Sequence, residues 1–197
     1  RERGAEVVVV DGGSRDGTAA LAAEHADRLV TAPRGRARQM NAGAGSAAGE
    51  VLWFLHADTR PPADALARIT AALCRGRAWG RFDVRLAPSG PLLRLVGAMM
   101  NRRSRLTGIA TGDQGMFVRR DVFAAAGGFP EIPLMEDVAM SRRLKRVAGR
   151  PACLRAPVAT SSRRWRERGV VRTIGLMWWL RLAFFLGVSP ARLARWY

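Results

Sequence analysis

Short apolar runs alternate with helix-like stretches in the first part of the chain. Glu6–Asp11 contains four consecutive valines, and Glu50–Leu55 is almost entirely apolar. Runs of this length without polar alternation are typical of strands buried on both faces of a parallel sheet. Further elements are predicted as a strand at Asp27–Thr31 and helices at Thr18–His25, 36–48 and Ala63–Arg75. The alternation predicts an α/β fold, with an open, mostly parallel sheet flanked by helices.

The second half of the chain is less regular. It predicts strands at 79–86, 115–119 and 153–159, and helices at 92–103 and 136–147. The tail Ile174–Val188 is rich in Leu, Trp and Phe, and is shorter than the roughly 20 residues that a spanning helix needs. It predicts an apolar, aromatic helix that packs within the protein or a dimer, lies in a membrane interface beside flanking arginines, or belongs to a spanning hairpin. We expect a main domain at 1–169 and an amphipathic helical segment at 170–197.

Composition adds a charge imbalance to this picture. Of 197 residues, 33 are Lys or Arg and 16 are Asp or Glu, which gives a net charge of +17. A basic surface serves nucleic acid, anionic lipid or a phosphate-bearing substrate, whereas a coding bias toward Arg and Ala leaves scattered arginines without a shared partner. Both interpretations stay open. Cys74 and Cys153 are the only cysteines and stand in no CxxC motif, so we expect a reducing, cytoplasmic location.

Carboxylates follow two of the predicted strands and open a helix. Asp11 and Asp58 stand at strand ends, and Glu136–Asp137 begins the helix at 136–147. Ligands gather at the carboxyl ends of strands in open α/β sheets, so two such carboxylates can hold a divalent cation and a nucleotide, and a third can act as a general base. Each also has a structural interpretation, as a turn or helix cap or as negative charge at a helix start.

Other polar residues add binding chemistry. His56 stands two residues before Asp58, where it can be a ligand, a hydrogen-bond partner or a packed side chain. The run Ser162–Arg166 places guanidinium groups around Trp165, which suits an anion clamp or a solvated loop. A second cationic cluster comprises Arg34, Arg36 and Arg38.

Together these motifs resemble a known family, the family 2 glycosyltransferases with the GT-A fold, whose sheet is Rossmann-like. The motifs that carry the resemblance are Val10–Thr18, Phe54–Thr59, Glu136–Asp137 and Arg164–Trp165. The resemblance runs from about Glu6 to Gly169. Gly112–Gly115 and the Ser-Arg-Arg-Trp run are most similar to a bacterial subgroup often named for arsenosugar biosynthesis or for diaponeurosporenoate glycosylation, a step of carotenoid biosynthesis.

The resemblance implies an inverting transfer of sugar from a nucleotide-diphosphate sugar, with UDP as the expected nucleotide. Asp137, in the pair with Glu136, would be the catalytic base. Asp58, with His56, would bind Mg²⁺ or Mn²⁺ on the diphosphate. The residues that would bind the nucleotide-sugar are Asp11, Gly12, Ser14, Arg38, Asp58, Arg164 and Trp165.

The chain departs from the family pattern at several positions. His56 stands where the family has the first Asp of its DxD motif, so metal binding rests more heavily on Asp58. Ser161 replaces the Gln of the QxxRW motif, and Gly12 replaces a second Asp that the family often has. The family's first strand and helix, which precede the valine-rich strand, are missing from the sequence, so we expect a sheet that lacks one of its inner strands.

The acceptor is expected to carry a hydroxyl or a carboxylic acid. The aromatic tail favours a lipid-like acceptor and a peripheral position on the inner face of the cell membrane, and a homodimer stays open as well. We expect no nucleic-acid partner. The alternatives are a nucleotidyltransferase of similar fold, which releases pyrophosphate rather than UDP, and a non-enzymatic basic module for nucleic acid or membrane. The turn after Asp11 is neither a P-loop nor a GxGxxG fingerprint, which argues against an ATPase and a nicotinamide enzyme.

Overall fold

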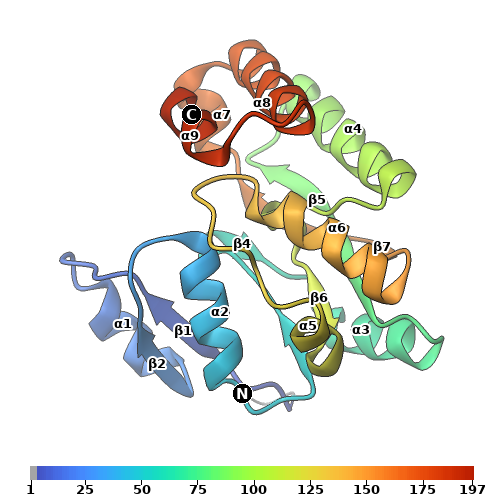
Figure 1. The fold of residues 1–197 in the computed structure, drawn as a ribbon. Helices are drawn as coiled ribbons and strands as arrows, with labels where there is room; N and C mark the ends of the chain where they lie inside the picture. The colour runs from blue at the N-terminus through green and yellow to red at the C-terminus, as the bar shows by residue number, and fades with distance from the viewer. Residues whose placement is uncertain (1–3) are drawn as a thin grey trace.

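The strands form two separate sheets, which helices cover (Figure 1). The computed structural model describes residues 4–197. β1 (Val8–Asp11) and β2 (Arg28–Thr31) pair in parallel. The other five strands form a mixed sheet in the order β3-β6-β5-β7-β4. Their bounds are Val51–Trp53 for β3, Thr59–Arg60 for β4, Trp79–Ala87 for β5, Phe117–Arg119 for β6 and Ala152–Ser161 for β7.

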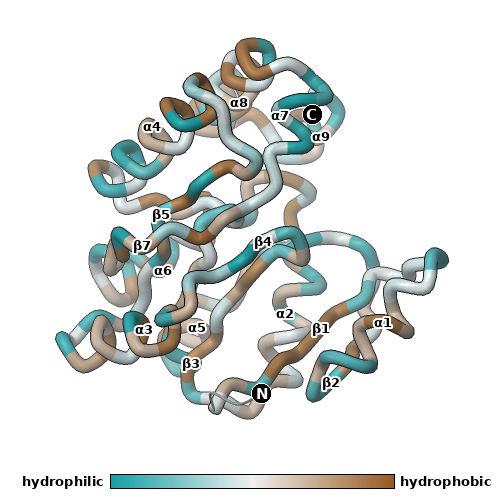
Figure 2. Tube along the Cα trace, turned by 180° about the vertical axis from the view of Figure 1, so that it is seen from behind, coloured by the Kyte–Doolittle hydropathy of each residue, from teal (hydrophilic) through white to brown (hydrophobic). Residues whose placement is uncertain are grey.

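Parallel and antiparallel pairs are combined in the larger sheet. β5 and β7 run parallel from Gly80 opposite Ala152 to Ala87 opposite Ser161, and β3–β6, β5–β6 and β4–β7 are antiparallel. The predicted α/β class is confirmed. Within residues 4–197, β1 does not pair with β3. The single sheet expected from the sequence is therefore split into two sheets, and the break lies between β1 and β3. Both carry apolar residues, seen in brown in Figure 2.

The predicted helices are confirmed with small shifts at their ends. The bounds are Thr18–His25 for α1, Arg36–Ser46 for α2, Ala65–Cys74 for α3, Pro91–Thr107 for α4, Arg120–Ala125 for α5, Glu136–Ala148 for α6, Arg163–Arg168 for α7, Val170–Phe185 for α8 and Pro190–Trp196 for α9. A 3-10 turn spans Gly112–Gln114. The pattern had not predicted this turn, β4, α7 or α9.

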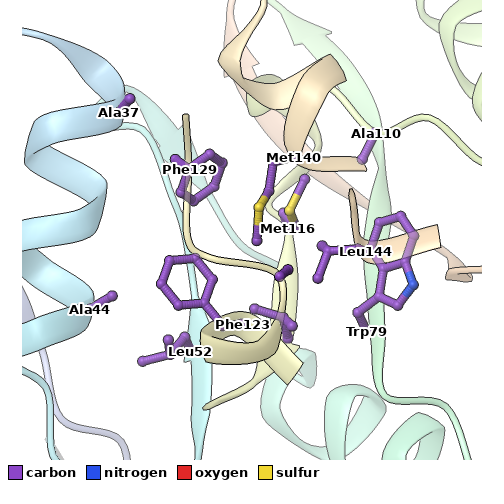
Figure 3. Packing of buried hydrophobic residues seen from close by; sticks show 12 residues of the cluster. Ala37, Ala44, Leu52, Trp79, Ala110, Met116, Phe123, Phe129, Met140 and Leu144 are labelled. Atoms are coloured by element: carbon purple, nitrogen blue, oxygen red, sulfur yellow. The ribbon is translucent and has the colours of Figure 1, made fainter. Parts of the chain in front are cut away.

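The main apolar core lies between α2, α5, α6 and the larger sheet (Figure 3). Met140 and Leu144 of α6 are completely buried, and they pack with Trp79 and Phe129. Burial of such side chains is worth about 1.5–3 kcal/mol each. Because α6 is fixed through this face, its first residues are held at the edge of the core.

Helix α2 joins the two sheets. Gln39 Nε2 donates to the carbonyl of Val10 in β1 at 3.1 Å. On the other side, Asn41 Nδ2 donates to the carbonyl of Phe129 at 2.8 Å, and its Oδ1 accepts from the Phe129 N–H at 2.9 Å. The Arg120 guanidinium donates to three carbonyls around the end of α2. The β1–β2 pair is thus connected to the rest of the fold through this helix.

The C-terminal helices pack on the beginning of α6. Leu180 and Ala183 of α8 and Leu193 of α9 form a cluster with Met135 and Val138. On another face, α8 packs against α4, and the two helices lie next to each other in Figures 1 and 2. In the part of the chain that the structure describes, every helix is too short or too polar to cross a bilayer.

Candidate active site

Asp137 stands in the first turn of α6 with both carboxylate oxygens held by backbone N–H groups. Its Oδ2 accepts from Gly112 N at 2.8 Å, and its Oδ1 accepts from Val138 N at 2.7 Å. The preceding Met135 has φ 68°, a left-handed conformation that is unusual for a residue other than glycine. Such backbone strain is found mainly where the surrounding structure enforces it, often at functional sites.

Glu136 is almost completely buried beside Asp137, with 3% of its surface exposed. Burial raises the pKa of Glu136, and the neighbouring charge of Asp137 raises it further. The Arg36 guanidinium from α2 lies 3.7 Å from Glu136 Oε1 and partly offsets both effects. Glu136 therefore holds its proton more tightly than an exposed carboxyl does.

His56 and Asp113 meet beside the Gly112 segment. His56 Nδ1 lies 3.5 Å from Asp113 Oδ1. Burial acts to raise the pKa of Asp113, but the hydrogen bond with His56 and the charges of His56, Arg36 and Arg164 outweigh it and lower this pKa. Asp113 thus stays ionised. A Cβ atom on Gly112 would approach His56 Nε2 to 2.6 Å, so any larger residue at this position would displace the His56 ring or the turn.

A pocket with a volume of about 70 Å³ opens in front of these carboxylates. Its polar wall combines positive and negative side chains and its other wall is apolar. The charged and aromatic lining residues are Arg36, Asp113, Glu136, Asp137, Arg164, Arg181 and Tyr197, and the apolar ones are Leu134, Met135, Val138, Met177 and Leu180. The high share of charged side chains suits a polar, charged ligand better than an apolar one.

Asp11 is placed by the turn that follows β1. It accepts hydrogen bonds from the backbone N–H groups of Gly13 and Ser14, both at 2.9 Å, and from the Ser14 hydroxyl. The Ser14 hydroxyl bond and these backbone bonds lower the pKa of Asp11. Asp11, Gly12 and Ser14 do not line the pocket around Asp137. Asp11 therefore caps its turn, and its contact with a donor nucleotide stays a prediction.

Asp58 and His56 were predicted to bind a divalent metal. Asp58 is exposed in the turn before β4, near enough to influence the pKa of Arg164. Residues 4–197 contain no cluster of three or more His, Cys, Asp or Glu side chains able to hold a metal. Mg²⁺ and Mn²⁺ prefer oxygen ligands, and in such sites Mg²⁺ is bound by one or two carboxylates together with substrate phosphates. Asp58 fits an ion shared with a diphosphate, whereas the imidazole of His56 lies beside Asp113 and is a less suitable ligand for this ion.

The predicted clamp of Arg164 and Trp165 is arranged differently from the expectation. Arg164 lines the pocket, and its guanidinium lies over the ring of Tyr197 at 5.0 Å, not over Trp165. Trp165 instead packs against the buried cluster of β5 and α4. Arg38 pairs with the exposed Glu131 at 3.2 Å, outside the pocket. Donor binding by Arg38 and Trp165 stays a prediction.

Four pocket residues were not singled out as site residues from the sequence. They are Arg36, Asp113, Arg181 and Tyr197. Three carried a signal: Arg36 belongs to the cationic cluster with Arg34 and Arg38, Asp113 belongs to the Gly112–Gly115 motif, and Arg181 is a charge inside an otherwise apolar helix. Long charged side chains are seldom buried without a function or a partner.

Comparison with known proteins identifies the family. The sequence pattern of the family described as "Glycosyl transferase family 2" matches residues 2–125. The chain belongs to glycosyl transferase family 2. The matched part of this family member includes Asp11, His56, Asp58 and Asp113, whereas Glu136 and Asp137 lie beyond it. No curated protein matches the chain.

Solved glycosyltransferase structures share the fold. Residues 1–349 of TarS from S. aureus superimpose with a TM-score of 0.63 at 18% identity, covering 80% of this chain and 51% of those TarS residues. The mannosyltransferase PcManGT from Pyrobaculum calidifontis, in complex with GDP-Man and Mn²⁺, gives 0.54 at 23% identity, covering 79% and 47%. Glucosyl-3-phosphoglycerate synthase from Mycobacterium tuberculosis, with Mn²⁺, UDP and glucosyl-3-phosphoglycerate, gives 0.56 at 16%, covering 79% and 59%. The chain thus spans about half the length of these proteins, and the fold is that of GT-A domains.

Proposed function

We propose that the protein is an inverting glycosyltransferase that uses a nucleotide-diphosphate sugar, with UDP as the nucleotide. The observation that carries the proposal is Asp137, fixed by two backbone N–H groups at the edge of a pocket that also contains arginines. The complexes of similar proteins with GDP-Man or UDP and Mn²⁺ support a nucleotide-sugar donor. The assignment to the subgroup named for arsenosugar biosynthesis or diaponeurosporenoate glycosylation stays a prediction.

Asp137 acts as the general base in this mechanism. It takes the proton of an acceptor hydroxyl while the acceptor oxygen attacks C1 of the sugar. The bond from C1 to the diphosphate oxygen breaks, its electron pair leaves with the diphosphate, and the configuration at C1 inverts. The backbone bonds to both oxygens of Asp137 fix the direction of the free lone pairs, which supplies the positioning that such a step needs.

The departing diphosphate gains negative charge as this bond breaks. In this proposal Arg164 and Arg36, which both line the pocket, stabilise that charge through bidentate hydrogen bonds to phosphate oxygens. A divalent ion bound with the diphosphate at Asp58 would neutralise part of its charge. The Arg164 guanidinium carbon lies 5.0 Å from the centroid of the Tyr197 ring, and this cation–π contact would limit the positions of that side chain.

A screen of nucleotide-sugars tests this function. Thermal denaturation of the protein with UDP-, GDP- and TDP-sugars, with and without Mn²⁺, should give a Mn²⁺-dependent stabilisation by one donor class. NMR of the product should then show inversion at C1. Release of pyrophosphate instead of a nucleoside diphosphate would support the alternative nucleotidyltransferase. Retained configuration at C1 would contradict the inverting mechanism.

We also propose that the outer face of α8 contacts the surface of an anionic membrane. Thr173, Leu180 and Ala183 face the protein, whereas Trp178 and Phe185 are 62% and 73% exposed. The helix is therefore apolar on its outer face as well, which is unusual for a helix facing water. Other exposed residues of this surface are Val171, Trp179, Leu182, Leu186 and Trp196, with Arg172, Arg192 and Arg195 among them.

The flanking arginines and the net charge of +17 favour an anionic lipid surface as the occupant. Cosedimentation with vesicles of phosphatidylglycerol should exceed that with phosphatidylcholine, and Trp178→Ser together with Phe185→Ser should reduce it. Leu21→Ser, which changes an exposed apolar residue of α1, serves as the control. Equal binding to both vesicle types, or a dimer in light scattering that the double variant dissociates, would contradict membrane contact.

A further inference from the structure

We propose that the acceptor carries an anionic group, a carboxylate or a phosphate, which binds at a basic subsite formed by Arg181 of α8 and Arg103 of α4. This inference rests on the proposed glycosyltransferase function, because it assigns the subsite to the acceptor of that reaction. It concerns a part of the pocket region that is separate from Arg36 and Arg164, the arginines assigned to the departing diphosphate.

Arg103 is a buried guanidinium without a hydrogen-bond acceptor. Its Nε and Nη2 atoms are shielded from solvent and have no hydrogen-bond partner in the structure. Its electrostatic neighbours are Arg181, Asp137 and Arg81. Burial lowers the pKa of Arg103 to about 10, and the positive charge of Arg181 contributes to this change. A buried cation that lacks acceptors is costly unless an anion compensates it.

Arg181 lines the pocket directly and lies within electrostatic range of Asp137. It is partly buried, and burial lowers its pKa. Within residues 4–197, neither Arg181 nor Arg103 has an ion-pair partner within 4 Å. Arg103 does not line the pocket itself, but it lies within electrostatic range of Arg181 and Asp137, and its helix α4 packs against α8.

The nearby carboxylates are already engaged. Asp137 receives backbone hydrogen bonds on both oxygens, and Glu136 pairs with Arg36. The neighbouring cation Arg81 pairs with Asp83. Asp137 lies within electrostatic range of both cations and Asp113 within range of Arg181, but within residues 4–197 neither guanidinium forms an ion pair with these carboxylates, and a ligand anion would supply that direct contact.

The chemistry of the pocket narrows the class of ligand. A guanidinium binds carboxylate and phosphate oxygens in a bidentate manner, which fixes orientation as well as charge. The apolar side chains of Met177 and Leu180 line the pocket near Arg181 along α8. An acceptor bound through its anionic group would lie over these side chains with a hydroxyl toward Asp137. The inferred class is a hydroxy acid or a hydroxylated phosphate ester.

Inorganic phosphate is the probe for this subsite. The protein is first saturated with UDP and Mg²⁺, so that the arginines of the diphosphate site are occupied, and phosphate is then titrated by calorimetry. We expect Arg181→Gln to weaken phosphate binding about tenfold or more, the loss of one charge-assisted interaction. NMR signals of the Arg181 and Arg103 Nε–H groups should shift in the same titration. Arg102→Gln, which changes an exposed neighbour on α4, should leave the affinity unchanged.

Several outcomes would overturn the inference. Equal phosphate affinity in wild type and Arg181→Gln would contradict the proposed subsite. Continued UDP binding and UDP-sugar hydrolysis in that case would leave the proposed glycosyltransferase function intact. If the protein fails to bind UDP but still binds phosphate through Arg181, the anion site exists and its assignment to a glycosyl acceptor is wrong. If Arg181→Gln does not fold, Arg103→Met is measured instead, and it should weaken phosphate binding to the same extent.

A soluble and a lipid-borne anion are distinguished by a second ligand. Dihexanoyl phosphatidic acid is titrated below its micellar concentration under the same conditions. Affinity well above that of inorganic phosphate, lost in Arg181→Gln, supports a lipid-borne phosphate. Similar affinities that are both lost in this variant support a soluble acceptor.

Discussion

The backbone N–H of Gly112 donates a hydrogen bond of 2.8 Å to Oδ2 of Asp137, across 25 positions of the sequence. This bond connects the 3-10 turn to the first turn of α6. On its other side Gly112 contacts the region of His56, where an added Cβ would lie 2.6 Å from Nε2 and 2.8 Å from Cε1. The position of Asp137, the proposed base, is thus coupled to the imidazole of the predicted metal site.

Gly112→Ala should lower turnover by about 10- to 100-fold, because displacement of a positioned group by about 1 Å costs this much. The new methyl group would push His56 or the turn, and with it the N–H that holds Asp137. The clash is with the end of a side chain, so the protein should still fold. Gly175→Ala in α8, which meets nothing within 4 Å, is the control and should retain full activity. Equal turnover in both variants would contradict this coupling.

Asp137→Asn and Asp58→Asn should separate catalysis from donor binding. Asp137→Asn removes the base and should reduce turnover by about 10²–10⁴-fold with donor affinity largely unchanged. Asp58→Asn removes a predicted ligand of the metal, so it should weaken the Mn²⁺-dependent binding of the donor. Calorimetry of donor binding beside steady-state kinetics measures both. An equal loss of donor affinity in the two variants would contradict the separate roles.

Glu136 should make stability fall as pH rises above 4.5. Its pKa is raised in the folded protein above the ordinary value of 4.5, so the folded state binds a proton more tightly than the unfolded state between these two pKa values. This loss of stability between the two pKa values should not occur in Glu136→Gln. The difference in free energy of unfolding between the variant and wild type should rise with pH and then level off, as measured by urea denaturation. A difference that falls with rising pH would show that the Arg36 pair dominates.

Arg103→Met should raise the free energy of unfolding while it weakens phosphate binding about tenfold or more. The substitution removes two buried nitrogen atoms that have no hydrogen-bond partner. A buried polar group that is left without a partner lowers the free energy of unfolding by about 1–3 kcal/mol. Met retains much of the side-chain length. Arg102→Met, at the exposed neighbouring position, should change stability by less than about 0.5 kcal/mol. Marked destabilisation by Arg103→Met would mean that this guanidinium already has a compensating partner.

The strands could be predicted from local pattern because continuous apolar runs favour strands, although Val8–Val10 of β1 are only half-buried and not buried on both faces as expected. The four valines before Asp11 and the apolar run before His56 became β1 and β3. β4 could not be found in this way. It has only two residues, Thr59 and Arg60, and it exists through pairing with β7.

The pocket was harder to predict, because it depends on which side of a helix each arginine occupies. Arg36 and Arg38 are two residues apart on α2, so they point in very different directions around the helix axis. Arg36 reaches Glu136 in the pocket, whereas Arg38 pairs with Glu131 on the surface. The carboxylate pair of α6 was identified from its motif, but its arginine partners required the tertiary structure.

The division of the strands between two sheets has a mechanical consequence. Because α2 bonds to Val10 on one side and to Phe129 on the other, relative motion of the two sheets must bend or shift this helix. The β1–β2 pair should open more readily than the body of the protein and exchange its amide hydrogens sooner. A donor that bridged the turn at Asp11 and the carboxylate at Asp137 would act as a second brace. The measured free energy of donor binding would then be reduced by the cost of stiffening the molecule.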